Sequence, residues 1–207
     1  MISEATTISQ QQKSKLSFVV CPELSLIGPV HSLETGTIFQ LGETIHGETM
    51  DEMKKLAVSH QIHLVFGMIE SEQQLLYNSV FVIGPNGALF TKVRKVHLTE
   101  SDERWASAGN EIVVDSIMGI GRIGFMVGYD AAFPEMAGIM AGKNADYIII
   151  PSSWHGEFGQ TLCLNEKMMN NKYPVNTMTT WDSIARFSQA KTLIANFTGT
   201  SLKCRGG

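Results

Sequence analysis

The segment Ile123-Gly124-Phe125-Met126-Val127-Gly128-Tyr129-Asp130 joins a short apolar run to a polar turn. Residues 123–127 are apolar or small without interruption, which predicts a strand buried on both faces. A helix is expected to begin soon afterwards at Pro134, because proline suits a first helical turn and apolar residues follow it at core spacing. A buried strand that leads through a turn into a helix is typical of α/β proteins.

The rest of the chain repeats this alternation. Glycine, proline and asparagine at residues 84–87 predict a tight turn, so residues 79–83 and 88–91 are expected to form a hairpin. Residues 156–180 show no clear pattern and are expected to form a long loop with a short helix. Further strands are predicted at residues 16–20, 62–68, 147–150 and 192–197, and further helices at 49–60 and 181–190. The predicted class is therefore α/β, with sheets covered by helices.

Bulk composition limits the possible functions. The 207 residues, 43% of them hydrophobic, suit a single domain spanning residues 1–207. A net charge of -4 without any basic run argues against nucleic-acid binding. Without an apolar stretch of about 18 residues, we expect no membrane span and a cytoplasmic location. Three cysteines, Cys21, Cys163 and Cys204, have no metal-like spacing, so neither a disulfide framework nor a metal or other cofactor is expected.

Ionisable residues stand directly after three of the predicted strands or hairpins. Glu23 follows the strand at residues 16–20, Lys95 follows the hairpin, and Asp130 follows Gly128 and Tyr129 at the end of the central strand. Each taken alone is more often a solvated loop charge, an edge-strand charge or a turn. Their occurrence together and in this order favours a shared pocket, because a sheet can aim side chains from several strand ends into one place.

These three strings resemble the Glu, Lys and Cys motifs of the nitrilase, or carbon-nitrogen hydrolase, superfamily, over roughly residues 16–200. In that family the glutamate is a general base, and the lysine with a backbone amide stabilises an oxyanion; Glu23, Lys95 and Tyr129 match these positions. The resemblance also implies a second carboxylate after the lysine. Glu103 is the preferred candidate, with Glu100 as its rival. Ser153 and Trp154 match substrate-contacting positions.

One position departs from the family pattern, since Gly128 stands where the nucleophilic cysteine is expected. Glycine has no side chain with which to form an acyl-enzyme, although slow attack by water remains conceivable. Among possible substitutes, Cys21 is expected to pack in the core, and Cys163 could be a displaced thiol. Cys204 lies near a chain end. Ser152 and Ser153 lack a histidine at a persuasive spacing, and His155 is only adjacent in sequence.

The resemblance implies an α-β-β-α sandwich of two mixed sheets covered by helices. Compared with the family pattern the chain is shorter at both ends, which would leave sheet edges uncovered and favours a homo-oligomer. The expected function is hydrolysis of a small amide, carbamoyl compound or nitrile by ancestry, inactive or strongly impaired by Gly128. The alternative is a non-catalytic binding module or assembly subunit that holds a small amide or carboxylate. A decayed gene product is the third possibility.

Overall fold

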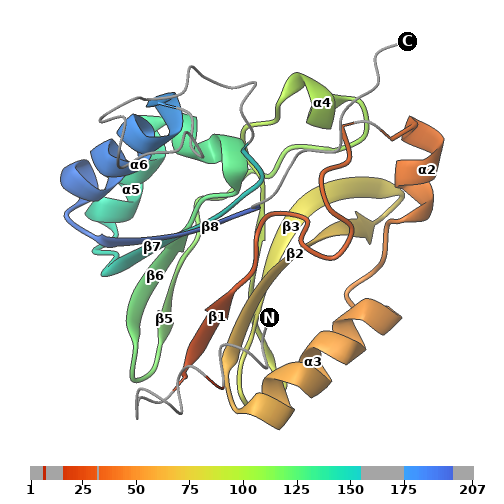
Figure 1. The fold of residues 1–207 in the computed structure, drawn as a ribbon, viewed down its shortest axis with the longest axis horizontal. Helices are drawn as coiled ribbons and strands as arrows, with labels where there is room; N and C mark the ends of the chain where they lie inside the picture. Colours follow the sequence, from red (N-terminus) through yellow and green to blue (C-terminus); the bar gives the residue numbers. More distant parts are fainter. Residues whose placement is uncertain (1–6, 8–15, 32, 155–174, 198–207) are drawn as a thin grey trace.

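The computed structural model describes residues 7, 16–31, 33–154 and 175–197. These residues form two four-stranded sheets that pack face to face (Figure 1). The first sheet has the order β1 (Phe18–Val20), β2 (His63–Glu72), β3 (Leu75–Ile83) and β4 (Leu89–Arg94). The second has the order β5 (Val114–Ile117), β6 (Gly121–Phe125), β7 (Tyr147–Ser152) and β8 (Lys191–Asn196). Both sheets are mixed, because each contains parallel and antiparallel pairs.

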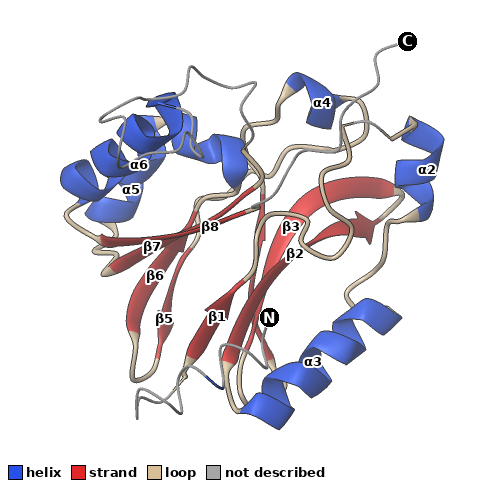
Figure 2. Cartoon of the chain, in the orientation of Figure 1, coloured by secondary structure: helices blue, strands red, loops and turns tan. Residues whose placement is uncertain are grey.

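Helices cover the outer face of each sheet (Figure 2). Helix α3 (Glu48–His60) packs on the first sheet, while α5 (Pro134–Gly142) and α6 (Val175–Ser188) pack on the second. Shorter helical segments are α2 (Thr35–Gln40), α4 (Glu100–Glu103) and the 3-10 turn η1 (Gly128–Ala132). The predicted α-β-β-α sandwich is therefore confirmed.

The alternation of side chains along each strand explains the four layers. In β2, Leu64 and Phe66 pack toward α3, whereas Val65 points at the facing sheet. In β7, Ile148 faces the helices and Ile149 faces the other sheet. Because successive residues of a strand point to opposite faces, a continuous apolar run is what a sheet covered on both faces requires.

Most predicted elements are found with shifted ends. The hairpin is confirmed, and Gly87 adopts φ +78° in its turn, a conformation that favours glycine. Helix α5 begins at Pro134 as predicted, and α3 begins one residue before the predicted start. Helix α6 begins at Val175, six residues before the predicted start at residue 181, so its first residues lie in the segment predicted as a long loop with a short helix. Residues 156–174 of that segment lie outside the described part. The sequence did not predict α2, α4 or β5, which are too short for a periodic pattern.

Candidate functional site

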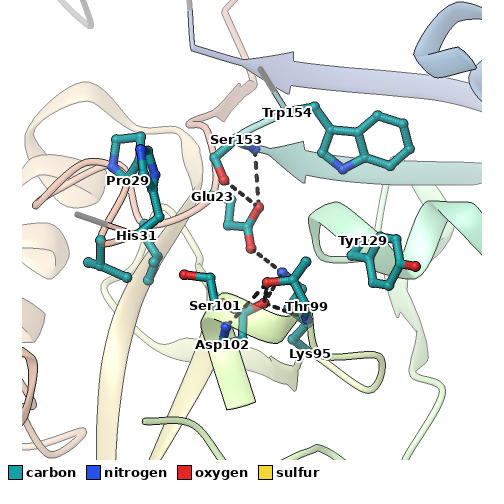
Figure 3. Close-up of a pocket in the computed structure, with 12 residues that line it drawn as sticks. Glu23, Pro29, His31, Lys95, Thr99, Ser101, Asp102, Tyr129, Ser153 and Trp154 are labelled. Atoms are coloured by element: carbon teal, nitrogen blue, oxygen red, sulfur yellow. Dashed lines mark hydrogen bonds and ion pairs between the residues drawn. The ribbon is translucent and has the colours of Figure 1, made fainter. Parts of the chain in front are cut away.

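A pocket opens where β1, β4 and β7 end, beside the 3-10 turn that follows β6 (Figure 3). Its space, including the open mouth, is about 530 Å³. Each contributing segment leaves a rigid strand, so side chains distant in sequence are held at one edge of the sandwich. The lining residues are Glu23, Leu24, Pro29, Val30, His31, Lys95, Thr99, Ser101, Asp102, Tyr129, Ser153 and Trp154.

The carboxylate of Glu23 forms the centre of this pocket and is only 2% exposed. Its Oε1 accepts hydrogen bonds from Asn78 Nδ2 and Lys95 Nζ, both at 2.8 Å. Its Oε2 accepts from the backbone N–H of Ser153 at 3.1 Å and from the Ser153 hydroxyl at 2.9 Å. A carboxylate has about four lone-pair sites, so these donors fill its accepting capacity.

The turn after β1 places Glu23 by a close approach of two backbones. The N–H of Cys21 donates to Val65 O at 2.8 Å, which keeps the chain beside β2 past the end of β1. Leu24 then adopts φ +49° and turns the chain. A Cβ at Gly67 of β2 would lie 2.6 Å from Leu24 N, closer than real Cβ contacts occur. Glycine at position 67 is therefore what allows the Glu23 turn to sit against the sheet.

Lys95 is 3% exposed and bridges two carboxylates. Its Nζ lies 2.8 Å from Glu23 Oε1 and 2.7 Å from Asp102 Oδ2. Burial opposes the charged form, but attraction to Glu23 and Asp102 outweighs it, so the pKa of Lys95 lies above its usual value. The lysine is consequently a fixed cation in the pocket.

The second carboxylate at Lys95 is Asp102, not the expected Glu103. Asp102 forms a capping box with Thr99 at the start of α4 and turns its Oδ2 toward the ammonium. Glu103 is exposed and does not line the pocket, because the next residue of a helix points about 100° away. Glu100 is exposed as well. The pattern of threonine followed three residues later by an acid could have identified Asp102.

Gly128 lies against Glu23, so the structure brings Glu23, Lys95 and Gly128 into one cleft. Gly128 is buried at the start of η1 and adopts φ +50°, a left-handed conformation. A Cβ added there would overlap Glu23 Oε2 and lie 2.8 Å from the carboxyl carbon. The carboxylate therefore fills the space that a side chain at position 128 would need.

Asp130 ties the segment after β4 to the turn that contains Gly128. Its carboxylate accepts from the backbone N–H groups of Val96, His97 and Val127 and from His97 Nδ1. Burial raises the pKa of Asp130, and the hydrogen bonds from His97 and Val127 oppose that rise. Asp130 therefore sets the position of Lys95 relative to Gly128. The sequence singled out Asp130 but not this role, and it missed the buried Asn78.

The remaining predicted site residues fall into two groups. Tyr129, Ser153 and Trp154 line the pocket, and Trp154 is held by paired backbone contacts with the Asn196 side chain at 2.8 and 2.9 Å. Cys21 packs in the core as expected, and burial raises the pKa of its thiol. His155, Cys163 and Cys204 lie outside the described residues. Among the described side chains, no group of three or more potential metal ligands occurs.

The family model described as carbon-nitrogen hydrolase matches residues 1–199. The chain belongs to the carbon-nitrogen hydrolase family. The resemblance predicted from its motifs is thereby confirmed. Among curated relatives, a probable nitrilase of Schizosaccharomyces pombe is 27% identical over 84% of this chain and 66% of its own length. A nitrilase of Pyrococcus abyssi is 32% identical over 70% of this chain and 55% of its own length.

Solved structures agree with the fold. A carbon-nitrogen hydrolase from Helicobacter pylori has a TM-score of 0.76 and 25% identity, covering 98% of this chain and 68% of its own. A nitrilase-superfamily member from Saccharomyces cerevisiae has a TM-score of 0.77 and 21% identity, with coverages of 98% and 69%. An amidase from Nesterenkonia in complex with butyramide has a TM-score of 0.71 and 17% identity, with coverages of 96% and 69%. This carbon-nitrogen hydrolase chain spans 55% to 66% of the two curated relatives named above.

Proposed function

We propose that this chain binds a small amide, carbamoyl compound or nitrile in the Glu23–Lys95 pocket, and that carbon-nitrogen hydrolysis there is strongly impaired. The observation that carries the proposal is a buried carboxylate-ammonium pair facing Gly128, which has no side chain to act as a nucleophile. Membership of the family supports the kind of ligand. Acyl transfer through residue 128 cannot occur, because no atom is present there to bond the acyl group.

The pocket retains groups that would polarise a carbonyl. Lys95 Nζ has three N–H bonds, and within the described residues two of them meet Glu23 and Asp102, which leaves the third for a ligand oxygen. Tyr129 lies in the first turn of η1, where backbone N–H groups have no acceptor inside the helix. Fixed donors in a buried site can stabilise a developing oxyanion by about 3 to 4 kcal/mol each.

Direct attack by water is the route that the family chemistry leaves open. General-base assistance by Glu23 would supply about 10²- to 10⁴-fold acceleration. All four acceptor sites of that carboxylate are already occupied by Asn78, Lys95 and Ser153, so a water must first displace one donor. This competition is why we expect slow turnover.

The second candidate function is that of a non-catalytic binding module. The charges of the pocket favour a neutral ligand for such a module. The lining carboxylates of Glu23 and Asp102 face one ammonium, that of Lys95, so these three groups together carry a formal charge of about -1. A free carboxylate would be repelled by this balance. An amide, being neutral and able both to donate and to accept, fits it better.

Binding and chemistry can be tested separately with butyramide as the probe. We expect the unmodified chain to show saturable binding in a thermal-shift or calorimetric titration, with little release of ammonia and no thioester detected by mass spectrometry. Gly128→Cys should gain an acyl-enzyme at residue 128. Gly119→Cys is the matched control, because Gly119 also has positive φ (+81°) and lies in open space away from the pocket.

The outcomes discriminate between the proposals. Failure of the unmodified chain to bind butyramide or any of a panel of small amides and nitriles would remove the assigned pocket function. A covalent adduct on Cys163 would show a displaced thiol and refute the impairment. If Gly128→Cys binds the amide but forms no adduct, the missing thiol alone does not account for the impairment.

Other expectations from the resemblance stay predictions. We propose a homo-oligomer, tested by light scattering after size-exclusion chromatography. A cytoplasmic location and a single domain over residues 1–207 remain to be tested by fractionation and limited proteolysis. Within residues 16–154 and 175–197, the structure contains no helix of a length and apolarity that would cross a bilayer.

A further inference from the structure

We propose that Ser153 is an acyl-accepting nucleophile in this pocket, with Glu23 as its general base. The idea rests on the proposed function, because it requires an amide to bind there, and it supplies a slow route to hydrolysis in place of the missing side chain at residue 128. The carrying observation is that the Ser153 hydroxyl donates to Glu23 Oε2 at 2.9 Å. A Cβ at Gly128 would overlap this same oxygen. Thus Ser153 and position 128 flank one carboxylate oxygen, and only Ser153 has an atom that can attack.

The backbone holds Ser153 firmly at this oxygen. The residue before Ser153 is Ser152, the last residue of β7, which pairs in parallel register with Asn196 of β8. The residue after Ser153 is Trp154, whose backbone forms two hydrogen bonds with the Asn196 side chain. Between these anchors the Ser153 N–H also donates to Glu23 Oε2, at 3.1 Å. Figure 3 shows both Ser153 donors directed at the carboxylate. Such a fixed pair is the geometry that nucleophile activation requires.

The reaction balances without a cofactor. Ser153 Oγ attacks the carbonyl carbon while its proton passes to Glu23 Oε2, and the carbonyl electron pair moves to the oxygen beside Lys95. The tetrahedral intermediate then expels ammonia or an amine, which takes the proton from Glu23 and leaves an acyl-serine ester. A water next gives a proton to Glu23 and attacks the ester. Release of the carboxylic acid returns the proton to Ser153 Oγ.

Neighbouring hydroxyl and thiol groups do not share this arrangement. The Ser152 hydroxyl is fully buried and has no hydrogen-bond partner among the described residues. The Thr99 hydroxyl both donates to Asp102 Oδ2 and accepts from Asp102 N, so it serves as a helix cap. Cys21 packs in the hydrophobic core with residues of β2 and α3 and does not line the pocket. Only Ser153, among the described pocket hydroxyls, donates to Glu23.

The test uses the full chain and p-nitrophenyl butyrate as an activated acyl donor. We expect a burst of p-nitrophenol and a butyryl group on the peptide containing Ser153, removable by hydroxylamine as an ester should be. Ser153→Ala should lose the adduct, whereas Ser153→Cys should keep it as a thioester. Ser152→Ala is the matched control, one residue away and without contact to Glu23, and should be labelled like the unmodified chain.

Each result bears on one claim. An adduct absent from Ser153 in a chain that binds butyramide would overturn the nucleophile and leave the proposed function standing. A chain that binds no amide would defeat the proposed function first. If Ser153 only positioned Glu23, Ser153→Cys would bind butyramide without becoming acylated. Because the adduct is sought first in the unmodified chain, poor folding of a variant does not rescue the idea.

Discussion

Substituting alanine for Gly128 measures how firmly the Glu23 carboxylate is held in the space beside residue 128. Two costs are expected. A φ of +50° costs a residue with a Cβ about 1 to 2 kcal/mol. The new Cβ would also overlap Glu23 Oε2, so the carboxylate must move away from Ser153. A hydrogen bond to a charged group is worth about 1.5 to 3 kcal/mol, so losing both bonds from Ser153 adds about 3 to 6 kcal/mol.

A matched variant separates the two costs. Gly119 adopts φ +81° in the β5–β6 turn and a Cβ there would meet nothing within 4 Å. Gly119→Ala therefore reports the cost of the backbone conformation alone. We expect the free energy of unfolding of Gly128→Ala, from urea titration monitored by circular dichroism, to fall at least about 3 kcal/mol further than that of Gly119→Ala.

The double variant Glu23→Ala/Gly128→Ala closes the test. Without the carboxylate, the added Cβ has space, so the second substitution should cost no more than Gly119→Ala does. The reasoning is refuted if Gly128→Ala and Gly119→Ala are destabilised equally. In that case the carboxylate moves freely, and the corner beside Gly128 is open to a ligand or a water.

Three further predictions follow from the same contacts. Gly67→Ala should destabilise the chain by more than about 2 kcal/mol and weaken butyramide binding, because its Cβ would displace the turn that carries Glu23. Asp102→Asn should lower the free energy of unfolding, measured by urea titration, by about 3 to 5 kcal/mol, because the buried ammonium of Lys95 loses one of its two carboxylate partners. The control Glu103→Gln, at an exposed side chain, should change it by less than about 0.5 kcal/mol. Equal effects would contradict the placement of Asp102. Glu70 of β2 is buried, which opposes its charged form, but its carboxylate accepts hydrogen bonds from Arg94, Lys92 and Ser79, which outweigh that effect, so its pKa lies below the ordinary value of 4.5. The stabilisation that Glu70 contributes is therefore fully present above pH 4.5 and is lost as the pH falls through the lower pKa of the folded chain. In Glu70→Gln, the midpoint of unfolding should therefore fall less steeply as the pH is lowered below about 4.5 than it does in the unmodified chain.

Local pattern was sufficient for most of the fold. A strand segment buried on both faces is apolar at nearly every position, so the apolar runs within β2, β6 and β7 could be recognised directly in the sequence. The proline at the start of α5 and the glycine-rich hairpin turn are likewise signals carried by a few adjacent residues. Short elements such as α4 could not be predicted, because four residues are too few to show a helical repeat of apolar positions.

The site was only partly readable. The order of the motifs predicted that Glu23, Lys95 and Gly128 share one pocket, but the second carboxylate was predicted to be Glu103. That choice depends on the phase of α4 relative to Lys95, since one residue along a helix turns a side chain by about 100°. The capping box at Thr99 sets this phase and directs Asp102 inward.

The amino-acid order alone established the family motifs, the layered α/β class and the lack of a side chain at position 128. Which atoms occupy the resulting space depended on three strand ends meeting at one edge of the sandwich. Glu23 and Ser153 are 130 residues apart, and their hydrogen bond exists because β1 and β7 belong to facing sheets. Contacts of that kind arise from packing between layers, which no local pattern of residues encodes.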